Sequence, residues 1–433
     1  MGETRPSDVV GPLVVAMAVA AVLTWIIGRL LGDRRRGALI VAPIVVGALM
    51  YGHVANLARP LHVPGLVQQA TWVAFTAVAF VAAIRLPRPR LATLDLFLTR
   101  LTTVLVVVTL AVIVPFQVGS FLEPSSVAVS GPIQTESSAQ KRDVYYLIWD
   151  RYGSDRSLAL RTGFQNDLTP WLEDHGFTNL PDSHANYVRT TLSLATTLNM
   201  QHLDELITPL NPESRSFRPL DDLLLGPVVP RQFQALGYRY IHIGSWYDAT
   251  DFDPSADVNY NWDGTSDFLE ELYGASAGPA LTKRLHLASV VPTHNEEHYD
   301  HGAYELARLD DMVAEPGPKF VFGHVLLPHP PYVFDADGSP FTADEVATLT
   351  QRERWERQLA YTNARIRALV EKLQALPPER QPIIILQADE GPYPAAYAAT
   401  RDVYDWSTAT ADELEMKFGI MNAWYLPDGE EGL

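Results

Sequence analysis

The sequence contains no cysteine among its 433 residues. Disulfide bonds, cysteine-ligated zinc and a thiol nucleophile are therefore excluded from any account of its structure or chemistry. Charged residues are also sparse, since Asp, Glu, Lys and Arg make up 19% of the chain, against 47% hydrophobic residues. A chain of this length exceeds one ordinary domain, so these averages can hide parts of different character.

Basic residues are too few to balance the acids, and the imbalance is uneven along the chain. The formal net charge is −18. Residues 1–120 hold 10 Lys or Arg and 4 Asp or Glu, whereas residues 121–433 hold 23 and 47. A field of that sign repels phosphate backbones, so the second part excludes nucleic acid as a partner.

Long uncharged runs are confined to residues 1–120, where four apolar stretches follow one another. They cover about residues 11–31, 37–57, 66–84 and 101–119. Each approaches the ~20 residues that span the hydrocarbon core of a bilayer. The first is too long, and followed by too many others, to be a cleaved signal peptide. The pattern predicts four transmembrane helices.

Arginines are concentrated in the first and third loops between these stretches: Arg34, Arg35, Arg36, Arg85, Arg88 and Arg90. Retained Lys and Arg mark the cytoplasmic side of a membrane protein. We therefore expect a multi-pass protein of the cell membrane, surrounded by membrane lipids. Everything after about residue 120 is expected to lie outside the cytoplasm.

Residues 121–140 are rich in Ser, Pro and Gln without periodicity, which predicts a linker. From residue 141 to 433, β-rich apolar runs alternate with helical patterns; the runs are 143–149, 239–245, 319–327, 382–388 and 419–426. The clearest helical pattern is 341–376, with Thr342 as its N-cap. Such alternation predicts an extracytoplasmic α/β domain with a mostly parallel sheet covered by helices on both faces.

Acidic residues directly follow two of the predicted strands. Asp150 ends the run 143–149, and Asp389 and Glu390 end the run 382–388. The carboxyl ends of parallel strands meet at one edge of a sheet, where ligands gather. Carboxylate oxygens suit Mg²⁺, Mn²⁺, Ca²⁺ or Zn²⁺. The alternative for each acid is a turn or helix N-cap.

Hydroxyl side chains cluster at a predicted helix start within residues 186–200, and Thr190 and Thr191 are adjacent there. Unpaired backbone N–H groups and the helix dipole at such a start favour an alkoxide or a phosphate oxygen. A neighbouring metal ion could make one of these hydroxyls a nucleophile. The alternative is a threonine-rich N-cap without chemistry.

Two histidine-bearing segments remain. His329 follows the run 319–327 between prolines, where it could donate to a phosphoryl or leaving-group oxygen. His324 lies inside that run and is interpreted as a packed core residue. The segment 294–301 carries three histidines at helical spacing, which indicates either a polar helix face or a metal chelate.

Together, four of these segments resemble, in order, the sulfatase-like branch of the alkaline phosphatase superfamily; they read VYYLIWDRYG, NYVRTTLSLATTLNM, LLPHPPYVF and IIILQADEGP. Membrane-anchored members of that branch include lipoteichoic acid synthases, phosphoethanolamine transferases and phosphoglycerol transferases. The resemblance covers roughly residues 140–430 and implies an alkaline phosphatase-like fold. Several helices followed by an external catalytic domain also match the anchored transferases.

The resemblance implies a role for each matching residue. Asp150, Thr190, Asp389 and Glu390 would bind one divalent cation. Thr190 would also be the nucleophile, with Thr191 as its adjacent rival, and His329 would lie near the phosphate of the substrate. Glu390 stands where the family usually has His, and this extra carboxylate favours Mn²⁺ or Mg²⁺ over Zn²⁺ or Ca²⁺.

The implied activity is that of a metal-dependent phosphoryl-ester hydrolase or transferase acting on lipid or glycopolymer head groups of the cell envelope. Without cysteine, the formylglycine that many sulfatases make from it is excluded, so phosphoric esters are preferred over sulfuric esters. Two alternatives stay open: a sulfatase or phosphodiesterase acting on soluble esters, and a non-catalytic descendant that binds the envelope. The sequence stops at Leu433, eleven residues after Asn422, which predicts either a C-terminally truncated domain or one trimmed at an edge.

Overall fold

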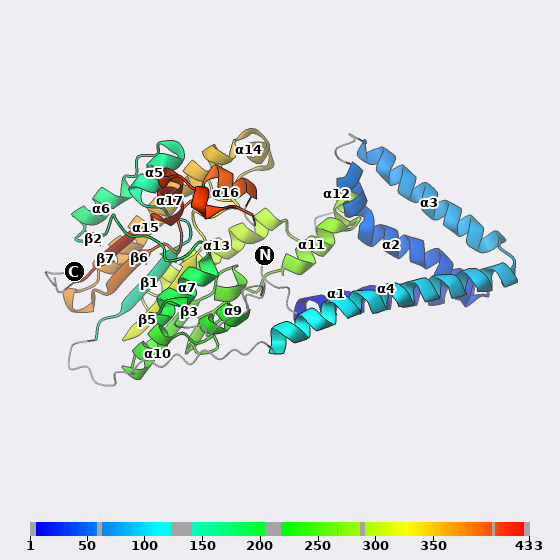
Figure 1. The fold of residues 1–433 in the computed structure, drawn as a ribbon, viewed down its shortest axis with the longest axis horizontal. Coiled ribbons are helices and arrows are strands. Elements are labelled where there is room, and N and C mark those ends of the chain that lie inside the picture. Colours follow the sequence, from blue (N-terminus) through cyan, green and yellow to red (C-terminus); the bar gives the residue numbers. More distant parts are fainter. Residues whose placement is uncertain are drawn as a thin grey trace. The chain divides into compact units, whose positions relative to one another are not determined.

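The computed structural model describes residues 6–58, 63–122, 141–203, 218–265, 267–285, 291–400 and 403–427. The chain forms two compact units (Figure 1). The first comprises Glu3–Leu122 and Thr265–His294, and the second comprises Glu123–Gly264 and Asn295–Leu433. Most of the predicted linker, residues 123–140, lies outside the described residues.

Four long helices make up most of the first unit: α1 (Pro6–Leu30), α2 (Arg34–Ala58), α3 (Gly65–Arg85) and α4 (Arg88–Leu122). By length and composition, each is able to cross a membrane. Their exposed surfaces carry large apolar side chains along most of their length, as lipid-facing helices do. The predicted four-helix transmembrane region is confirmed, and the chain is a membrane protein with a C-terminal soluble domain.

The two arginine-rich turns lie at the same end of the helical unit. Arg36, at the start of α2, donates to the last carbonyls of α3, including Ala83 at 2.7 Å and Leu86 at 3.1 Å. Arg35 pairs with Asp95 of α4 at 3.4 Å. A cation is favourable at these unpaired helix-end carbonyls. This arrangement allows both turns to face the same side of a membrane, as the arginine content of the loops predicts.

Two short helices from much later in the sequence belong to the same unit. They are α11 (Asp267–Ala275) and α12 (Gly278–Leu285). The backbone N–H of Ala277 donates to the carbonyl of Ala48 at 2.7 Å. A Cβ at Gly52 of α2 would lie 2.7 Å from the Ala275 backbone, so this close approach requires glycine.

A seven-stranded sheet forms the centre of the second unit: β1 (Val144–Trp149), β2 (Thr178–Asn179), β3 (Arg239–Ile243), β4 (Val258–Tyr260), β5 (Lys319–Val325), β6 (Ile383–Gln387) and β7 (Asn422–Tyr425). The strand order is β2-β7-β6-β1-β5-β3-β4. The five strands from β6 to β4 are parallel to one another, whereas β7 pairs antiparallel with both of its neighbours, β6 and β2. All five predicted runs form strands; β2 and β4 are too short to leave a period-2 pattern.

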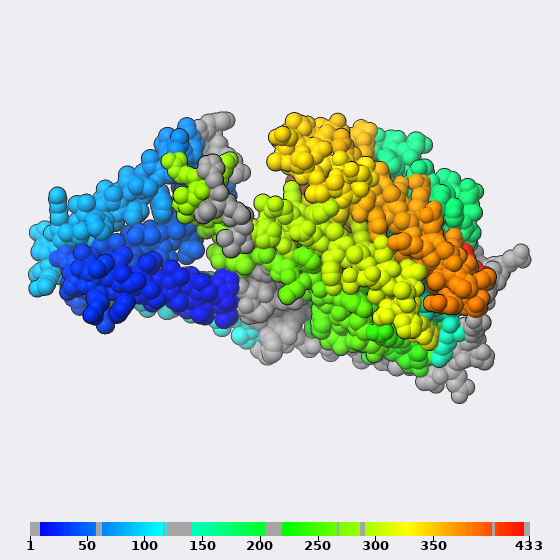
Figure 2. All heavy atoms as spheres, turned by 180° about the vertical axis from the view of Figure 1, so that it is seen from behind, coloured from blue at the N-terminus to red at the C-terminus, as the bar shows by residue number. Residues whose placement is uncertain are grey.

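Helices cover both faces of this sheet, because its buried strands are apolar on both sides. Tyr145, Leu147 and Trp149 of β1 face a core with α13 (His294–Asp311) and α15 (Gln351–Gln374). The alternate residues of β1 face a second core with α7 (Thr190–Asn199), α9 (Arg218–Leu224) and α10 (Val228–Ala235). Figure 2 shows α14 (Ala343–Thr348) and α15 in yellow to orange on one side of this unit. The predicted fold class is confirmed.

Shorter helices complete the described part of the second unit: α5 (Asp155–Thr162), α6 (Leu168–Asp174), α16 (Ala395–Thr400) and α17 (Ala411–Phe418). The predicted helix over 341–376 is two helices, α14 and α15. Thr342 caps the first as predicted, and Thr350 caps the second; both form capping boxes with a glutamate three residues later. The second capping box, which starts a new helix at Gln351, explains the interruption.

Glu305 of α13 is a buried acid with 1% of its surface exposed, and its Oε1 atom has no hydrogen-bond partner among the described residues. Burial raises the pKa of Glu305 well above its usual value. The folded state therefore binds a proton that the unfolded state loses above about pH 4.5, so this residue reduces stability increasingly as the pH rises. We expect Glu305→Gln to raise the melting temperature of the detergent-solubilised protein.

The gain from Glu305→Gln should widen from pH 5 to pH 8 in thermal unfolding scans, because glutamine has no charge to lose. Glu371→Gln, at an exposed position of α15, provides a control with the same change in charge. A gain that is equal at both pH values would contradict a neutral, buried Glu305.

Candidate metal centre

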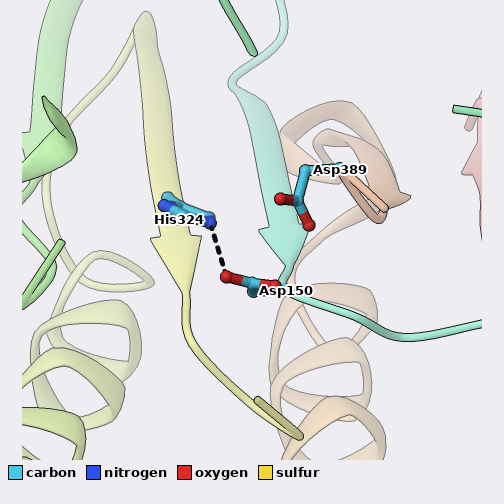
Figure 3. A group of neighbouring side chains, drawn as sticks. All are labelled: Asp150, His324 and Asp389. Carbon is cyan, nitrogen blue, oxygen red and sulfur yellow. Dashed lines mark ion pairs between the residues drawn. The ribbon is translucent and has the colours of Figure 1, made fainter. Parts of the chain in front are cut away.

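The carboxyl ends of β1, β5 and β6 bring three polar side chains together. Asp150 follows β1, and its backbone N–H donates to Val325 at the end of β5 at 2.9 Å. His324 is the penultimate residue of β5, and Asp389 follows β6. One ligand atom from each of these residues lies within 4.8 Å of the other two (Figure 3). All three side chains are buried.

His324 is held in a fixed orientation by hydrogen bonds. Its Nδ1 atom is 2.8 Å from the hydroxyl of Thr250, which is 2.8 Å from that of Ser245. Its Nε2 atom faces Asp150 Oδ2 at 3.6 Å (Figure 3). In metal-binding histidines, one ring nitrogen is typically held by a hydrogen bond to another protein group while the other nitrogen faces the ion. The sequence interpretation of His324 as a packed core residue missed this placement, although its burial was correct.

Several buried side-chain atoms of the centre and of nearby His329 lack hydrogen-bond partners among the described residues: Asp150 Oδ1, Asp389 Oδ2, His324 Nε2 and His329 Nδ1. Buried polar atoms are normally paired, and unpaired ones cost free energy. Two buried carboxylates and one imidazole nitrogen form a donor set that fits a divalent cation. The residues present therefore fit such an ion.

The carboxyl groups at the centre also repel each other when both are ionised. Burial, followed by the charges of Asp150 and Glu390, raises the pKa of Asp389 well above its usual value. Burial has the same tendency at Asp150, but His329, His324 and Arg151 outweigh it and hold the pKa of Asp150 low. Neighbouring carboxylates oppose each other's ionisation. A cation between them would favour the charged form of both.

Thr190 and Thr191 take different partners. Thr190 is the first residue of α7, is partly exposed, and its hydroxyl forms a hydrogen bond that lowers the pKa of Asp389. The hydroxyl of Thr191 is buried against that of Tyr247. Of the two rival hydroxyls, Thr190 is the one beside the carboxylate of this centre.

His329 lies in the loop after β5, on the same side as Asp150. His329 and Asp150 are close enough to shift each other's pKa, and the ring of His329 is 5.2 Å from that of Trp246. Burial, with the charge of Arg151 next, lowers the pKa of His329 to about 3, so its imidazole is neutral at pH 7. Gln358 holds the loop by donating to the His329 carbonyl at 2.9 Å.

Glu390, which the sequence groups with Asp150, Thr190 and Asp389 as a metal ligand, instead binds two cationic side chains. Its Oε1 accepts from Arg151 Nε at 2.8 Å, and its Oε2 accepts from the buried Lys417 ammonium of α17. Burial lowers the pKa of Lys417, and the charge of Glu390 opposes this shift. Tyr393 lies beneath both cations, 3.6 Å from the Arg151 guanidinium and 4.2 Å from the Lys417 ammonium. Both carboxylate oxygens of Glu390 are thus already in charged hydrogen bonds.

The three histidines of residues 294–301 do not converge. His298 packs against Trp246 with ring centres 4.3 Å apart, and His301 lies 3.3 Å from the Gly244 carbonyl. His294 contacts Glu270 at 3.2 Å. Among the described residues, the possible metal cluster is Asp150, His324 and Asp389, so this helix provides core packing rather than a chelate.

No protein-family model matches the chain, and no curated protein matches it. Among solved structures, it is similar to the C-terminal periplasmic domain of EcEptC from Escherichia coli, at 14% identity over 67% of this chain and 74% of that one, with a TM-score of 0.42. It is also similar to the integral membrane protein lipooligosaccharide phosphoethanolamine transferase A (EptA) from Neisseria meningitidis, at 12% identity over 96% and 76%, with a TM-score of 0.42.

A third similar structure is the lipoteichoic acid synthase LtaP from Listeria monocytogenes, at 12% identity over 71% of each chain, with a TM-score of 0.38. The second and third of these are named as a phosphoethanolamine transferase and a lipoteichoic acid synthase, two of the enzyme classes that the sequence resemblance names. At such identities, the likeness concerns the fold alone.

The Lys417–Glu390 pair generates a stability prediction. Lys417→Met would leave a buried carboxylate with one cation in place of two, and breaking a buried pair costs about 3–5 kcal/mol. We expect a clearly lower melting temperature for the detergent-solubilised variant. Adding Glu390→Gln should recover part of the loss, because the uncompensated charge is then removed. A single variant as stable as the wild type would contradict a structural role for this pair.

The unpaired ligand atoms generate a second prediction. Mn²⁺ or Zn²⁺ should stabilise the full-length protein against heat, by about 2.7 kcal/mol at a hundredfold excess over the dissociation constant. Asp150→Asn should abolish this gain, and so should His324→Ala. Asp335→Asn should keep the stabilisation by metal, because Asp335 pairs with Arg357 of α15 and is not part of the centre. Equal gains in all four proteins would place the cation elsewhere.

Proposed function

We propose that the protein is a membrane-anchored, metal-dependent phosphoester transferase or hydrolase that acts on lipid- or polymer-linked head groups of the cell envelope. The observation that carries this proposal is the convergence of Asp150, His324 and Asp389, with unpaired ligand atoms, beside the hydroxyl of Thr190. EptA, which the chain resembles, is named a lipooligosaccharide phosphoethanolamine transferase, and LtaP is named a lipoteichoic acid synthase. The likeness agrees with the proposal but does not carry it.

The proposed ligand set is Asp150, Asp389, His324 and Thr190. It differs from the sequence expectation, because Glu390 already binds Arg151 and Lys417 whereas His324 offers a nitrogen. An imidazole in place of a third carboxylate favours Mn²⁺ or Zn²⁺ over Mg²⁺ or Ca²⁺. A divalent cation in this position supplies positive charge that offsets the phosphate oxygens and lowers the pKa of a neighbouring hydroxyl.

Thr190 is the proposed nucleophile. Its hydroxyl lies at the start of α7, where free backbone N–H groups favour negative charge. In the first step, a bond forms between Thr190 Oγ1 and phosphorus while the bond to the departing alcohol breaks, and the threonine proton ends on that alcohol. In the second step, water or an acceptor hydroxyl or amine attacks phosphorus, the bond to Thr190 breaks and the proton returns to it.

His329 and the loop that carries it complete the proposed site. A neutral imidazole can donate one ring N–H to a phosphoryl or leaving-group oxygen without bringing a charge of its own. Gln358 and the flanking prolines limit the movement of this loop, which keeps the donor in position. The helices of the first unit would hold the site near substrates borne by lipid at the outer leaflet.

The test is intact-mass analysis of the full-length protein in detergent after incubation with Mn²⁺ and a p-nitrophenyl phosphodiester. Wild type should gain a covalent phosphoryl adduct and release p-nitrophenol, and Thr190→Ala should do neither because it lacks the attacking oxygen. Thr191→Ala is the matched control and should keep the adduct. A p-nitrophenyl sulfate incubated in parallel separates phosphoryl from sulfuryl chemistry.

Two outcomes would count against the proposal. An adduct that persists in Thr190→Ala would move the nucleophile elsewhere. A folded, metal-binding wild type that forms no adduct and releases no p-nitrophenol from any tested ester would favour the non-catalytic alternative, in which the fold binds envelope polymer.

A further inference from the structure

A cavity of about 380 Å³ opens beside the candidate metal centre, within the second unit. Its walls include Arg151, Arg161 and Arg354, together with Tyr332, Trp355 and Tyr393. Pro328 and Pro330, which flank His329, also line it. It is large enough for a phosphate group with several attached atoms, since small-ligand pockets typically measure ~300–1,000 Å³.

The charge of this cavity is opposite to that of the protein. Three arginines line it, and no Asp or Glu is among its lining residues, although the chain carries a net charge of −18. Acidic side chains outnumber basic ones in residues 121–433, so a cavity lined at random there would include carboxylates. A cavity lined by one sign of charge concentrates ligands of the opposite sign.

Two of the arginines have no carboxylate partner among the described residues. Arg161 donates to the Tyr332 hydroxyl at 3.1 Å, and its guanidinium lies 4.8 Å from the Trp355 ring centre. Burial and the charge of Arg151 lower the pKa of Arg161. The Nε of Arg354 is buried without a hydrogen-bond partner. These guanidinium groups keep donors available for a phosphate or carboxylate group.

Arg151 links the cavity to the candidate metal centre. Its Nε is 3.9 Å from Asp150 Oδ1, and its backbone N–H is 3.4 Å from Asp389 Oδ1. Its guanidinium lies over Tyr393, a wall of the cavity. A group bound in the cavity would therefore lie next to a phosphoester at the centre, close enough for both to belong to one substrate molecule.

We propose that this arginine pocket binds a second oxyanion of the donor substrate, separate from the phosphoester that reacts. This inference rests on the proposed phosphoryl chemistry and narrows its substrate class. A donor with a further phosphate or carboxylate satisfies the unpartnered donors of Arg161 and Arg354. A donor with an ammonium group at this position, as in ethanolamine, meets the cations of Arg161 and Arg354, and no carboxylate of the described residues lines the pocket to bind it.

Binding of inorganic phosphate to the metal-free, full-length protein in detergent tests the pocket without any turnover. Calorimetric titration of wild type should give saturable binding, weakened at higher salt. Arg161→Gln and Arg354→Gln should each weaken it roughly 10- to 100-fold, because each removes charged hydrogen bonds. Arg354→Lys should recover part of the affinity by restoring the charge.

Arg352→Gln is the matched control. Arg352 lies on α15 two residues before Arg354, but it pairs with Glu356 and does not line the cavity. It should bind phosphate like wild type. Thermal unfolding of each variant checks that the fold is intact. Absent binding in the wild type, or equal binding in all variants, would overturn the proposal.

Turnover then tests which substrates the pocket selects. The assay compares three p-nitrophenyl phosphodiesters whose second arm ends in a phosphate, a hydroxyl or an ammonium group. We expect kcat/KM to decrease in that order. The preference for the phosphate-ended ester should disappear in Arg161→Gln and Arg354→Gln, mainly through KM. Phosphate binding without turnover of any ester would support the pocket and refute the proposed function. Turnover that is fastest with the ammonium-ended ester would refute the pocket alone.

Discussion

The parallel pairing of β1 between β5 and β6 is the constraint on which the candidate site depends. In this register Ile148 lies opposite both His324 and Gln387, so three strands reach the same edge of the sheet together. His324 and Asp389, which follow Asp150 far along the sequence, thereby become its neighbours. The hydrogen bond from the Asp150 N–H to Val325 extends the ladder by one residue and fixes the acid where the strand ends. A shift of one residue would turn these side chains to the other face of the sheet.

The buried charges around this edge are arranged in two groups with opposite requirements. Glu390, Arg151 and Lys417 satisfy one another and share the ring of Tyr393, so they need nothing from outside. Asp150 and Asp389 form the second group with His324; Asp150 has only Arg151 at 3.9 Å, and each acid keeps one buried oxygen without a hydrogen-bond partner among the described residues. The first group holds the loops after β1 and β6 in place. The second is left able to bind, which is the arrangement expected of a site rather than of a core.

Arg151 connects the two groups and the arginine pocket. Its backbone adopts the left-handed region, with φ at 59°, which is unusual for a residue with a side chain. Such conformations cost on the order of 1–3 kcal/mol and persist where surrounding contacts enforce them. Here, the turn directs the guanidinium to Glu390 and Tyr393 while the backbone N–H stays near Asp389. Arg151 can thus bind Glu390 and still line the cavity beside the candidate metal centre.

The sequence by itself determined the elements whose signals are local: four apolar helices, five strands, the Thr342 cap and the acids that follow β1 and β6. Hydrophobic periodicity and length are properties of neighbouring residues, so they could be recognised without a structure. The tertiary structure alone decided that His324 faces Asp150, that Glu390 binds Lys417, and that α11 and α12 join the helical unit. Each of these depends on contacts between distant segments, for which a single sequence carries no periodic signal. The partners of Glu390 and the three arginines of the cavity were therefore beyond prediction, whereas the strand-end acids were not.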